Sequence, residues 1–176
     1  MVPVVETCAA HVSTTWYNPP MSALLLSGKE VAAAMFAELE PKIKKLDPKL
    51  VVVQVGNDPA SESYIRQKMK SCDAVGMRHE HIHMEEKTTK DELFATIERM
   101  NADPDVTGFI VQLPLPKHLE KFVPQVIKAI DPKKDVDGFG AYNLGKMFLS
   151  VEYEDLPPST PSGVLRMLEF YKVPIE

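Results

Sequence analysis

The stretch SESYIRQKMK, residues 61–70, holds residue types that could carry acid–base chemistry on an aromatic ligand. On a helix, where each residue turns by about 100°, Lys68 lies at the edge of the apolar face, one turn from Tyr64 and two turns from Ser61. A partly desolvated ammonium loses its proton more readily and can act as a base, while a tyrosine ring offers a flat face for stacking. The structural alternatives are a surface lysine with a buried stem and a half-buried core tyrosine.

Two later segments carry polar residues in places where a ligand could use them. The segment VQLPLP (111–116) puts Gln112 at the end of an apolar run, and a buried amide there must bond either the loop backbone or a ligand and a neighbouring side chain. The segment DPKKDVDGF (131–139) is typical of an Asx-type turn. Its carboxylates, Asp135 and Asp137, are too few for a metal site on their own, but one could accept hydrogen bonds from an amino-pyrimidine edge.

Two short patterns match known site signatures without the structural context that those signatures require. HEHIH (79–83) fits the zinc-protease pattern, which needs a helix, whereas the alternation here predicts a strand that separates His79 from His83 by about 13 Å. A zinc hydrolase therefore remains a weak hypothesis, and we expect no metal. GFGAYNLG (138–145) resembles a dinucleotide fingerprint, but its glycine spacing differs and no strand precedes it, so we expect no nucleotide site there.

Helical and strand patterns alternate along the chain, which predicts an α/β fold of three α/β/α layers around a mainly parallel sheet. One expected helix begins near Asp58 or Ser61 and ends around Gly76. The other expected helices are 27–46, 89–103, 118–130, 143–148 and 161–173, and the expected strands are 49–56, 78–84 and 106–116. Ligands of open α/β sheets bind beyond the carboxyl ends of the strands. Lys68, Gln112 and the Asp-rich loop (131–139) should therefore converge at one cleft.

Length, charge and cysteine content narrow the class of protein. The 176 residues fit one folded domain at 21–176 after a flexible N-terminal extension at 1–20. A net charge of −5 gives no indication of a nucleic-acid or membrane partner, and no apolar run approaches the roughly 20 residues of a membrane helix. Two cysteines, Cys8 and Cys72, fit a reducing compartment such as the cytoplasm.

Four motifs, in this order and spacing, resemble one enzyme family. They are VGNDPASESYIRQKMKSCDAVGM, GFIVQLPLPKHL, DPKKDVDGF and PSTPSG. The chain from about residue 21 to 176 is similar to the methylenetetrahydrofolate dehydrogenase/methenyltetrahydrofolate cyclohydrolase family, called FolD in bacteria. In that family the first domain is an α/β layer that binds folate, and the second is a Rossmann domain that binds NAD(P).

The resemblance implies a role for each residue singled out above. Lys68 corresponds to the catalytic base and acid, Tyr64 to the residue that stacks on the pterin, Gln112 to the partner of the lysine, and Asp137 to the carboxylate that holds the pterin. Substrate contacts are expected from Ser61, Tyr64, Ile65, Arg66, Gln67, Lys68, Val111, Gln112, Leu113 and Asp137. The implied substrate is a tetrahydrofolate derivative, the implied hydride acceptor is NAD(P), and a homodimer is expected.

Family members continue past the point that corresponds to KVPIE into the glycine-rich dinucleotide domain, which is absent from this sequence. We therefore expect folate binding and weakened cyclohydrolase chemistry, with the dehydrogenase activity belonging to a longer enzyme. The alternative is a non-catalytic folate-binding or assembly module that keeps the fold. The presence of Tyr64, Lys68, Gln112 and Asp137 together counts against that alternative, because nothing in a scaffold requires all four, whereas the missing dinucleotide domain counts for it.

Overall fold

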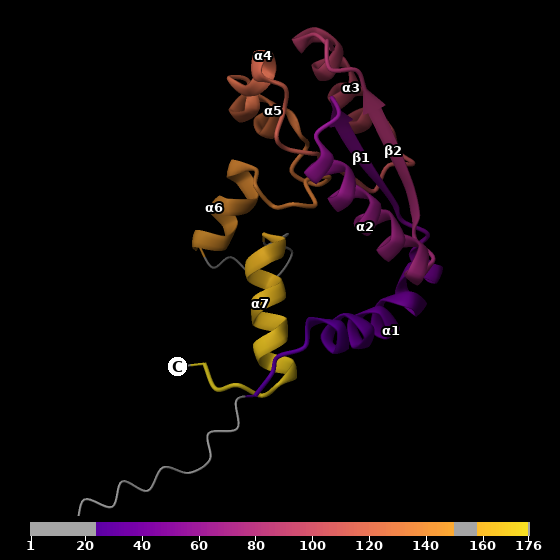
Figure 1. Ribbon diagram of the computed structural model, residues 1–176, viewed down its shortest axis with the longest axis vertical. Helices are drawn as coiled ribbons and strands as arrows, with labels where there is room; N and C mark the ends of the chain where they lie inside the picture. Colours follow the sequence, from indigo (N-terminus) through magenta and orange to yellow (C-terminus); the bar gives the residue numbers. More distant parts are fainter. Residues whose placement is uncertain (1–23, 150–157, 176) are drawn as a thin grey trace, which may run out of the picture.

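The computed structural model describes residues 24–149 and 158–175, in which helices and strands alternate (Figure 1). The strands are β1 (Lys49–Val55), β2 (Arg78–Met84) and β3 (Gly108–Val111). The helices are α1 (Gly28–Leu46), α2 (Pro59–Val75), α3 (Lys90–Ala102), α4 (Lys117–Glu120), α5 (Val123–Ala129), α6 (Ala141–Leu149) and α7 (Ser159–Phe170). The predicted α/β class is confirmed, and the proposed extension at 1–20 lies outside the described residues.

The three strands form one parallel sheet in the order β2-β1-β3. Along β1, Lys49 to Val55 pair with Arg78 to Met84 of β2, and on the other side Leu50 to Val53 pair with Gly108 to Val111 of β3. Beyond β3, Phe109 forms a further parallel bridge with Asp135. Because the carboxyl ends of parallel strands meet at one edge of a sheet, the loops that follow β1 and β3 leave the sheet on the same side.

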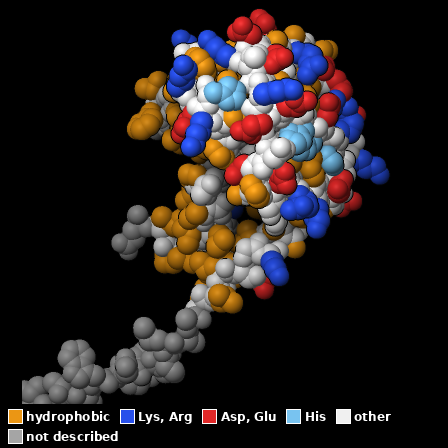
Figure 2. Space-filling view, turned by 45° about the horizontal axis from the view of Figure 1, so that its top comes forward, with side chains coloured by type: hydrophobic (Ala, Val, Ile, Leu, Met, Phe, Trp, Pro, Cys, Tyr) orange, Lys and Arg blue, Asp and Glu red, His pale blue; other side chains and the backbone are white. Residues whose placement is uncertain are grey.

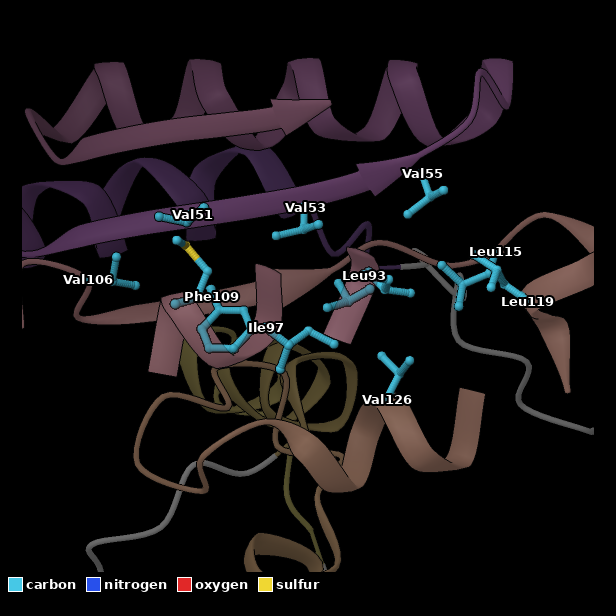
Figure 3. Packing of buried hydrophobic residues seen from close by; sticks show 12 residues of the cluster. Val51, Val53, Val55, Leu93, Ile97, Val106, Phe109, Leu115, Leu119 and Val126 are labelled. Carbon is cyan, nitrogen blue, oxygen red and sulfur yellow. The ribbon is translucent and has the colours of Figure 1, made fainter. Parts of the chain in front are cut away.

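The core lies on the face of the sheet that α3 and α5 cover. Val51, Val53 and Val55 of β1 project toward Leu93 and Ile97 of α3 in Figure 3, and all five side chains are buried. Alternate side chains of a strand point to opposite faces, so the other face of β1 is covered by α2. Helices on both faces explain why the central strand reads as a continuous apolar run.

Local signals define both ends of α2, the helix that carries the candidate lysine. Asp58 is the N-cap, and its side chain accepts a hydrogen bond of 2.7 Å from the backbone N–H of Ser61. Gly76 ends the helix in the left-handed conformation at φ 70°, where a glycine meets no steric penalty. Of the two starts that the sequence allows, the structure has Asp58 as the cap, and the predicted end at Gly76 is confirmed.

Two predicted elements differ most from the structure, while the expected helices 143–148 and 161–173 are α6 and α7 with ends shifted by one to three residues. The expected strand 106–116 is shortened to the four residues of β3, because the chain leaves the sheet after Gln112 and the prolines that follow have no N–H for a ladder. The expected helix 118–130 is divided into α4 and α5, which restarts at Val123 with Pro124 in its first turn. A proline is accepted there because the first N–H groups of a helix lack intrahelical partners.

The last two helices differ in surface character from the rest of the molecule. Charged side chains cover most of the upper part of Figure 2, whereas hydrophobic side chains gather below it. The exposed apolar residues of α6 and α7 are Tyr142, Met147, Phe148, Leu149, Val164, Leu165 and Phe170. None of the described helices is long and apolar enough to cross a membrane.

Candidate active site

A cavity of about 210 Å³ opens at the carboxyl end of β3, the place that the order of the strands predicts. Side chains from α2, β3, α5, the Asp-rich loop and α7 line it. They are Tyr64, Lys68, Phe109, Ile110, Val111, Gln112, Leu113, Val126, Ile127, Ile130, Asp135, Asp137, Phe139, Ser159 and Thr160. The structure thus brings together Lys68, Gln112 and the Asp-rich loop, as expected from the sequence.

Lys68 and Tyr64 form a pair on the side of α2 that faces the cavity. The Lys68 Nζ lies 4.9 Å from the centroid of the Tyr64 ring, within the range of a cation–π contact. Lys68 is half-buried, whereas Tyr64 is 60% exposed and leaves much of its ring accessible. This arrangement offers a flat aromatic surface with an amine held directly beside it.

Gln112 continues the hydrogen bonding of β3, and its side chain is left incompletely paired. Its backbone N–H donates to the Val53 carbonyl at 2.8 Å, which holds the residue at the end of the strand. Its Nε2 donates to the Leu113 carbonyl, also at 2.8 Å. Its Oε1 is buried and has no hydrogen-bond partner among the residues that the structure describes. A buried acceptor without a partner is destabilising, so this oxygen is available to an N–H of a ligand or an amine.

Asp137 supplies a carboxylate to the lining of the same cavity. Burial raises the pKa of Asp137 above its ordinary value, the positive charge of Lys68 opposes that shift, and the nearby Asp135 adds to it. The cavity therefore combines an amine, an amide oxygen without a partner and a partly desolvated carboxylate around an aromatic face. Such a set can orient a flat, nitrogen-rich ring and move a proton at one of its atoms.

The other predicted site residues of α2 occupy different surroundings. Ser61 is buried and does not line the cavity, and its hydroxyl donates to the Leu113 carbonyl at 3.4 Å, which ties the start of α2 to the loop after β3. Ile65 is 2% exposed and belongs to the core. Arg66 is exposed, and Gln67 lines a neighbouring apolar cavity of about 800 Å³ that also reaches Tyr64 and Lys68. Val111 and Leu113, by contrast, border the first cavity.

Several lining residues were not singled out from the sequence. Ser159 and Thr160 reach the cavity from the start of α7, and Phe139 reaches it from the Asp-rich loop. The motif PSTPSG contains Ser159 and Thr160, so the signal was present, but nothing in its spacing indicates which cavity it meets. Ile127 and Ile130 carried no signal beyond helical periodicity.

The histidines of β2 have partners that belong to the fold. The Nε2 of His79 donates to Asp73, that of His81 to Gln54 Oε1 and that of His83 to the Gly56 carbonyl, at 2.9 Å, 3.0 Å and 3.0 Å respectively. The segment is a strand, as predicted, so the helical spacing that the zinc hypothesis requires is not present. Within the described part of the chain, no three His, Cys, Asp or Glu side chains are grouped to hold a metal ion.

The glycine pattern at 138–145 also has a structural role. The backbone N–H groups of Gly138 and Gly140 donate to the carboxylate of Asp135, at 3.1 Å and 2.7 Å. These N–H groups are therefore engaged within the loop in this structure.

Comparison with known proteins places this chain and its fold in a family. Residues 26–137 match the model of the tetrahydrofolate dehydrogenase/cyclohydrolase catalytic domain. The chain belongs to this family. Relatives named bifunctional protein FolD include one from Agathobacter rectalis, 41% identical over 159 residues, and one from Anaeromyxobacter dehalogenans, 44% identical over 155 residues. These alignments cover 88% and 85% of the chain but 56% and 54% of the relatives, so the chain spans about half the length of the curated relatives it matches.

Solved structures of the family have the same fold. The FolD methylenetetrahydrofolate dehydrogenase/cyclohydrolase of Campylobacter jejuni superposes with a TM-score of 0.80 at 36% identity, over 85% of this chain and 54% of that one. The Trypanosoma brucei enzyme, solved with NADP cofactor and an inhibitor, gives a TM-score of 0.79 at 28% identity, over 86% of this chain and 52% of that one. The family resemblance stated from the four motifs is thereby confirmed.

Proposed function

We propose that this chain is the folate-binding catalytic domain of a bifunctional 5,10-methylenetetrahydrofolate dehydrogenase/5,10-methenyltetrahydrofolate cyclohydrolase. The main support is the Gln112 Oε1, a buried acceptor without a described partner, in the same cavity as Lys68, Tyr64 and Asp137. In this proposal Tyr64 stacks on the folate ring system, Asp137 accepts hydrogen bonds from the amino-pyrimidine edge and Gln112 accepts one from the Lys68 amine.

The cyclohydrolase step follows from the charge of the substrate. A methenyl cation beside Lys68 disfavours a second positive charge, so the lysine is driven toward its neutral amine. The amine takes a proton from water as the water oxygen bonds to the methenyl carbon. The resulting ammonium then protonates the departing ring nitrogen as the C–N bond breaks, and the hydroxyl proton passes to solvent as the formyl carbonyl forms. The products are 10-formyltetrahydrofolate and one proton.

Gln112 suits this cycle because an amide accepts a hydrogen bond without adding charge. A carboxylate in its place would hold the lysine in its protonated form and would prevent it from acting as a base. The amide orients the nitrogen lone pair toward the attacking water while its own Nε2 stays on the Leu113 carbonyl.

Hydride transfer to NAD(P) needs a dinucleotide site, which we assign to the longer polypeptide of the family. The N–H groups of Gly138 and Gly140, in the loop whose Asp135, Asp137 and Phe139 line the cavity, are bound to Asp135 and do not fit a pyrophosphate. We therefore derive the acid–base step alone from the residues of this chain. We further propose a folded domain at 21–176, a homodimer for the longer form and a cytoplasmic location.

The test is the hydrolysis of 5,10-methenyltetrahydrofolate, followed by its loss of absorbance, with the 176-residue chain, Lys68→Ala and Lys70→Ala. Lys70 is an exposed lysine of the same helix and serves as the matched control. Activity above the uncatalysed rate that is lost only in Lys68→Ala supports the proposal. Folded proteins that bind folate but show no lysine-dependent rate would favour the alternative of a non-catalytic folate-binding module.

A further inference from the structure

Asp135 is a buried carboxylate in the same loop as Asp137, yet its chemical situation differs. It is 4% exposed and lies where Phe109 of β3 forms its parallel bridge, so its backbone is held against the sheet. The N–H of Phe109 donates to the Lys134 carbonyl at 3.0 Å, which reinforces that attachment. The loop thus leaves the sheet from a defined point directly beside the candidate site.

Both oxygens of Asp135 accept hydrogen bonds from the loop, and one also accepts from α6. Its Oδ1 accepts from the Gly138 N–H at 3.1 Å, and its Oδ2 accepts from the Gly140 N–H at 2.7 Å and from Asn143 Nδ2 at 3.0 Å. Asn143 is 6% exposed and also donates to the Pro132 carbonyl at 3.0 Å. A charged acceptor makes hydrogen bonds stronger than neutral ones, so these contacts stabilise one conformation of residues 135–140.

The geometry of the loop leaves little room for another arrangement. Gly138 has φ 67°, a conformation that side-chain-bearing residues rarely adopt. A Cβ added to Gly140 would lie 2.8 Å from the Asp135 Oδ2, closer than real Cβ contacts. The backbone therefore turns tightly around the Asp135 carboxylate. Asp137 lies within this turn, between Asp135 and the glycines that donate to it.

We propose that Asp135 is a positioning residue for the folate site, with Asn143 as its clamp from α6. Its carboxylate closes the 135–140 turn so that Asp137 faces the cavity that Lys68 also lines, and Asp135 itself makes no bond to substrate. The inference rests on the proposed function, because it assigns Asp135 an effect on folate that is transmitted through Asp137. It also explains why Asp135 and Asp137, two residues apart, have different roles: the first closes the turn and the second faces the cavity.

The direct test is Asp135→Asn, which keeps the shape of the side chain and replaces one acceptor by an amide that faces N–H donors. We expect the Gly138 and Gly140 amide protons to lose protection from hydrogen exchange and the carboxyl pKa of Asp137 to fall, both measured by NMR. We expect the affinity for tetrahydrofolate to fall about tenfold. The matched control is Asp131→Asn, because Asp131 bonds only the nearby Lys133 N–H through its side chain in the described structure and does not line the cavity.

A double-mutant cycle separates positioning from a general structural role. If Asp135 acts through Asp137, then Asp135→Asn in an Asp137→Asn background causes no further loss of tetrahydrofolate affinity. An equal loss in both backgrounds would overturn the proposal, as would unchanged exchange at Gly138 and Gly140 in Asp135→Asn. Should that variant fail to fold, Asn143→Ala removes one donor and leaves both glycine bonds. It should shift the same signals and weaken binding about threefold, and unchanged signals would overturn the proposal.

Failure of the proposed function gives a different result. A wild-type chain that does not bind tetrahydrofolate refutes the proposed function. The positioning of Asp137 by Asp135 is then still decided by the exchange of the two glycine amides and the titration of the Asp137 carboxyl.

Discussion

The two strands that flank β1 both pair with it in parallel, but the polar side chains on and directly after them differ in whether they have hydrogen-bond partners. On one side, β2 is a seven-residue edge strand with partly exposed side chains, and each of its three histidines has a hydrogen-bond partner within the fold. On the other side, β3 is four residues long, wholly buried, and followed by Gln112, whose Oε1 has no described partner. Polar groups that are hydrogen-bonded within the fold indicate a structural role, whereas a buried polar group without a partner indicates a ligand site.

The satisfied side of the sheet still supports the site indirectly. The Gly56 carbonyl, at the end of β1, accepts hydrogen bonds from both Gln54 and His83, at 3.0 Å each. Gly56 begins the loop that leads to the Asp58 cap of α2. The β2 histidines therefore contribute to holding the helix that presents Lys68, and changes to them should alter stability more than chemistry.

The largest effect on the cyclohydrolase rate should come from replacing Lys68, which lines the cavity together with β3. We expect Lys68→Ala to lower the cyclohydrolase rate by about 10²–10⁴-fold, the usual contribution of a general acid or base. His83→Ala, on the β2 side, should leave the rate within about twofold while lowering the free energy of unfolding by about 1 kcal/mol. Steady-state rates and urea unfolding of both variants measure the contrast. Comparable loss of rate in His83→Ala would break the distinction between the two sides.

A smaller effect is expected at the oxygen without a partner. Gln112→Leu removes the acceptor that orients the lysine, and we expect about a tenfold fall in rate. Stability should change by less than about 1 kcal/mol, because removing a buried unsatisfied acceptor offsets the lost bond to the Leu113 carbonyl. Thermal unfolding alongside the rate assay tests both parts. A strongly destabilised Gln112→Leu would show that the oxygen serves the fold.

Asp137 should make folate binding sensitive to acid. Only the ionised carboxylate accepts both hydrogen bonds from an amino-pyrimidine edge, and burial raises the pKa of Asp137 above its ordinary value. Tetrahydrofolate affinity should therefore fall as the pH drops through that raised pKa. The fall should begin at a higher pH than for an ordinary aspartate, whose pKa is about 3.9. In Asp137→Asn this step should disappear and the affinity near neutral pH should be about tenfold lower. Titration calorimetry at several pH values is the measurement, and an unchanged acid step in Asp137→Asn would contradict it.

The smallest effect concerns the histidines of β2. Burial lowers the pKa of His81 below 6.5, and the neighbouring His83 lowers it further. The unfolded chain then binds the proton more readily, so this contribution to stability is complete above about pH 6.5 and is lost as the pH falls through the folded pKa. Urea unfolding should show a shallower loss of stability with acidification in His81→Gln than in the wild type. Parallel pH profiles would exclude a role for His81 in this loss.

Much of the fold could be predicted because its signals are local. The cap at Asp58, the glycine stop at Gly76 and the β-branched run of β1 are each read from residues a few positions apart. The exact extent of β3 and the break between α4 and α5 could not be predicted. Both depend on how the backbone around a proline packs against other segments of the chain. The candidate site was predicted in its main residues by family motifs, not by spacing alone.

The sequence by itself determined the element types, the two ends of α2 and the face of α2 on which Lys68 lies, because these follow from side chains on neighbouring turns and alternate strand positions. Only the tertiary structure decided which polar atoms are satisfied. Gln112 bonds Val53, Ser61 bonds Leu113 and Asp135 is clamped by Asn143, and each pair joins different elements or loops. Hydrogen bonding between distant segments depends on how the layers pack. It distinguishes the carboxylate of Asp135, which has hydrogen-bond partners, from the Oε1 of Gln112, which has none among the described residues.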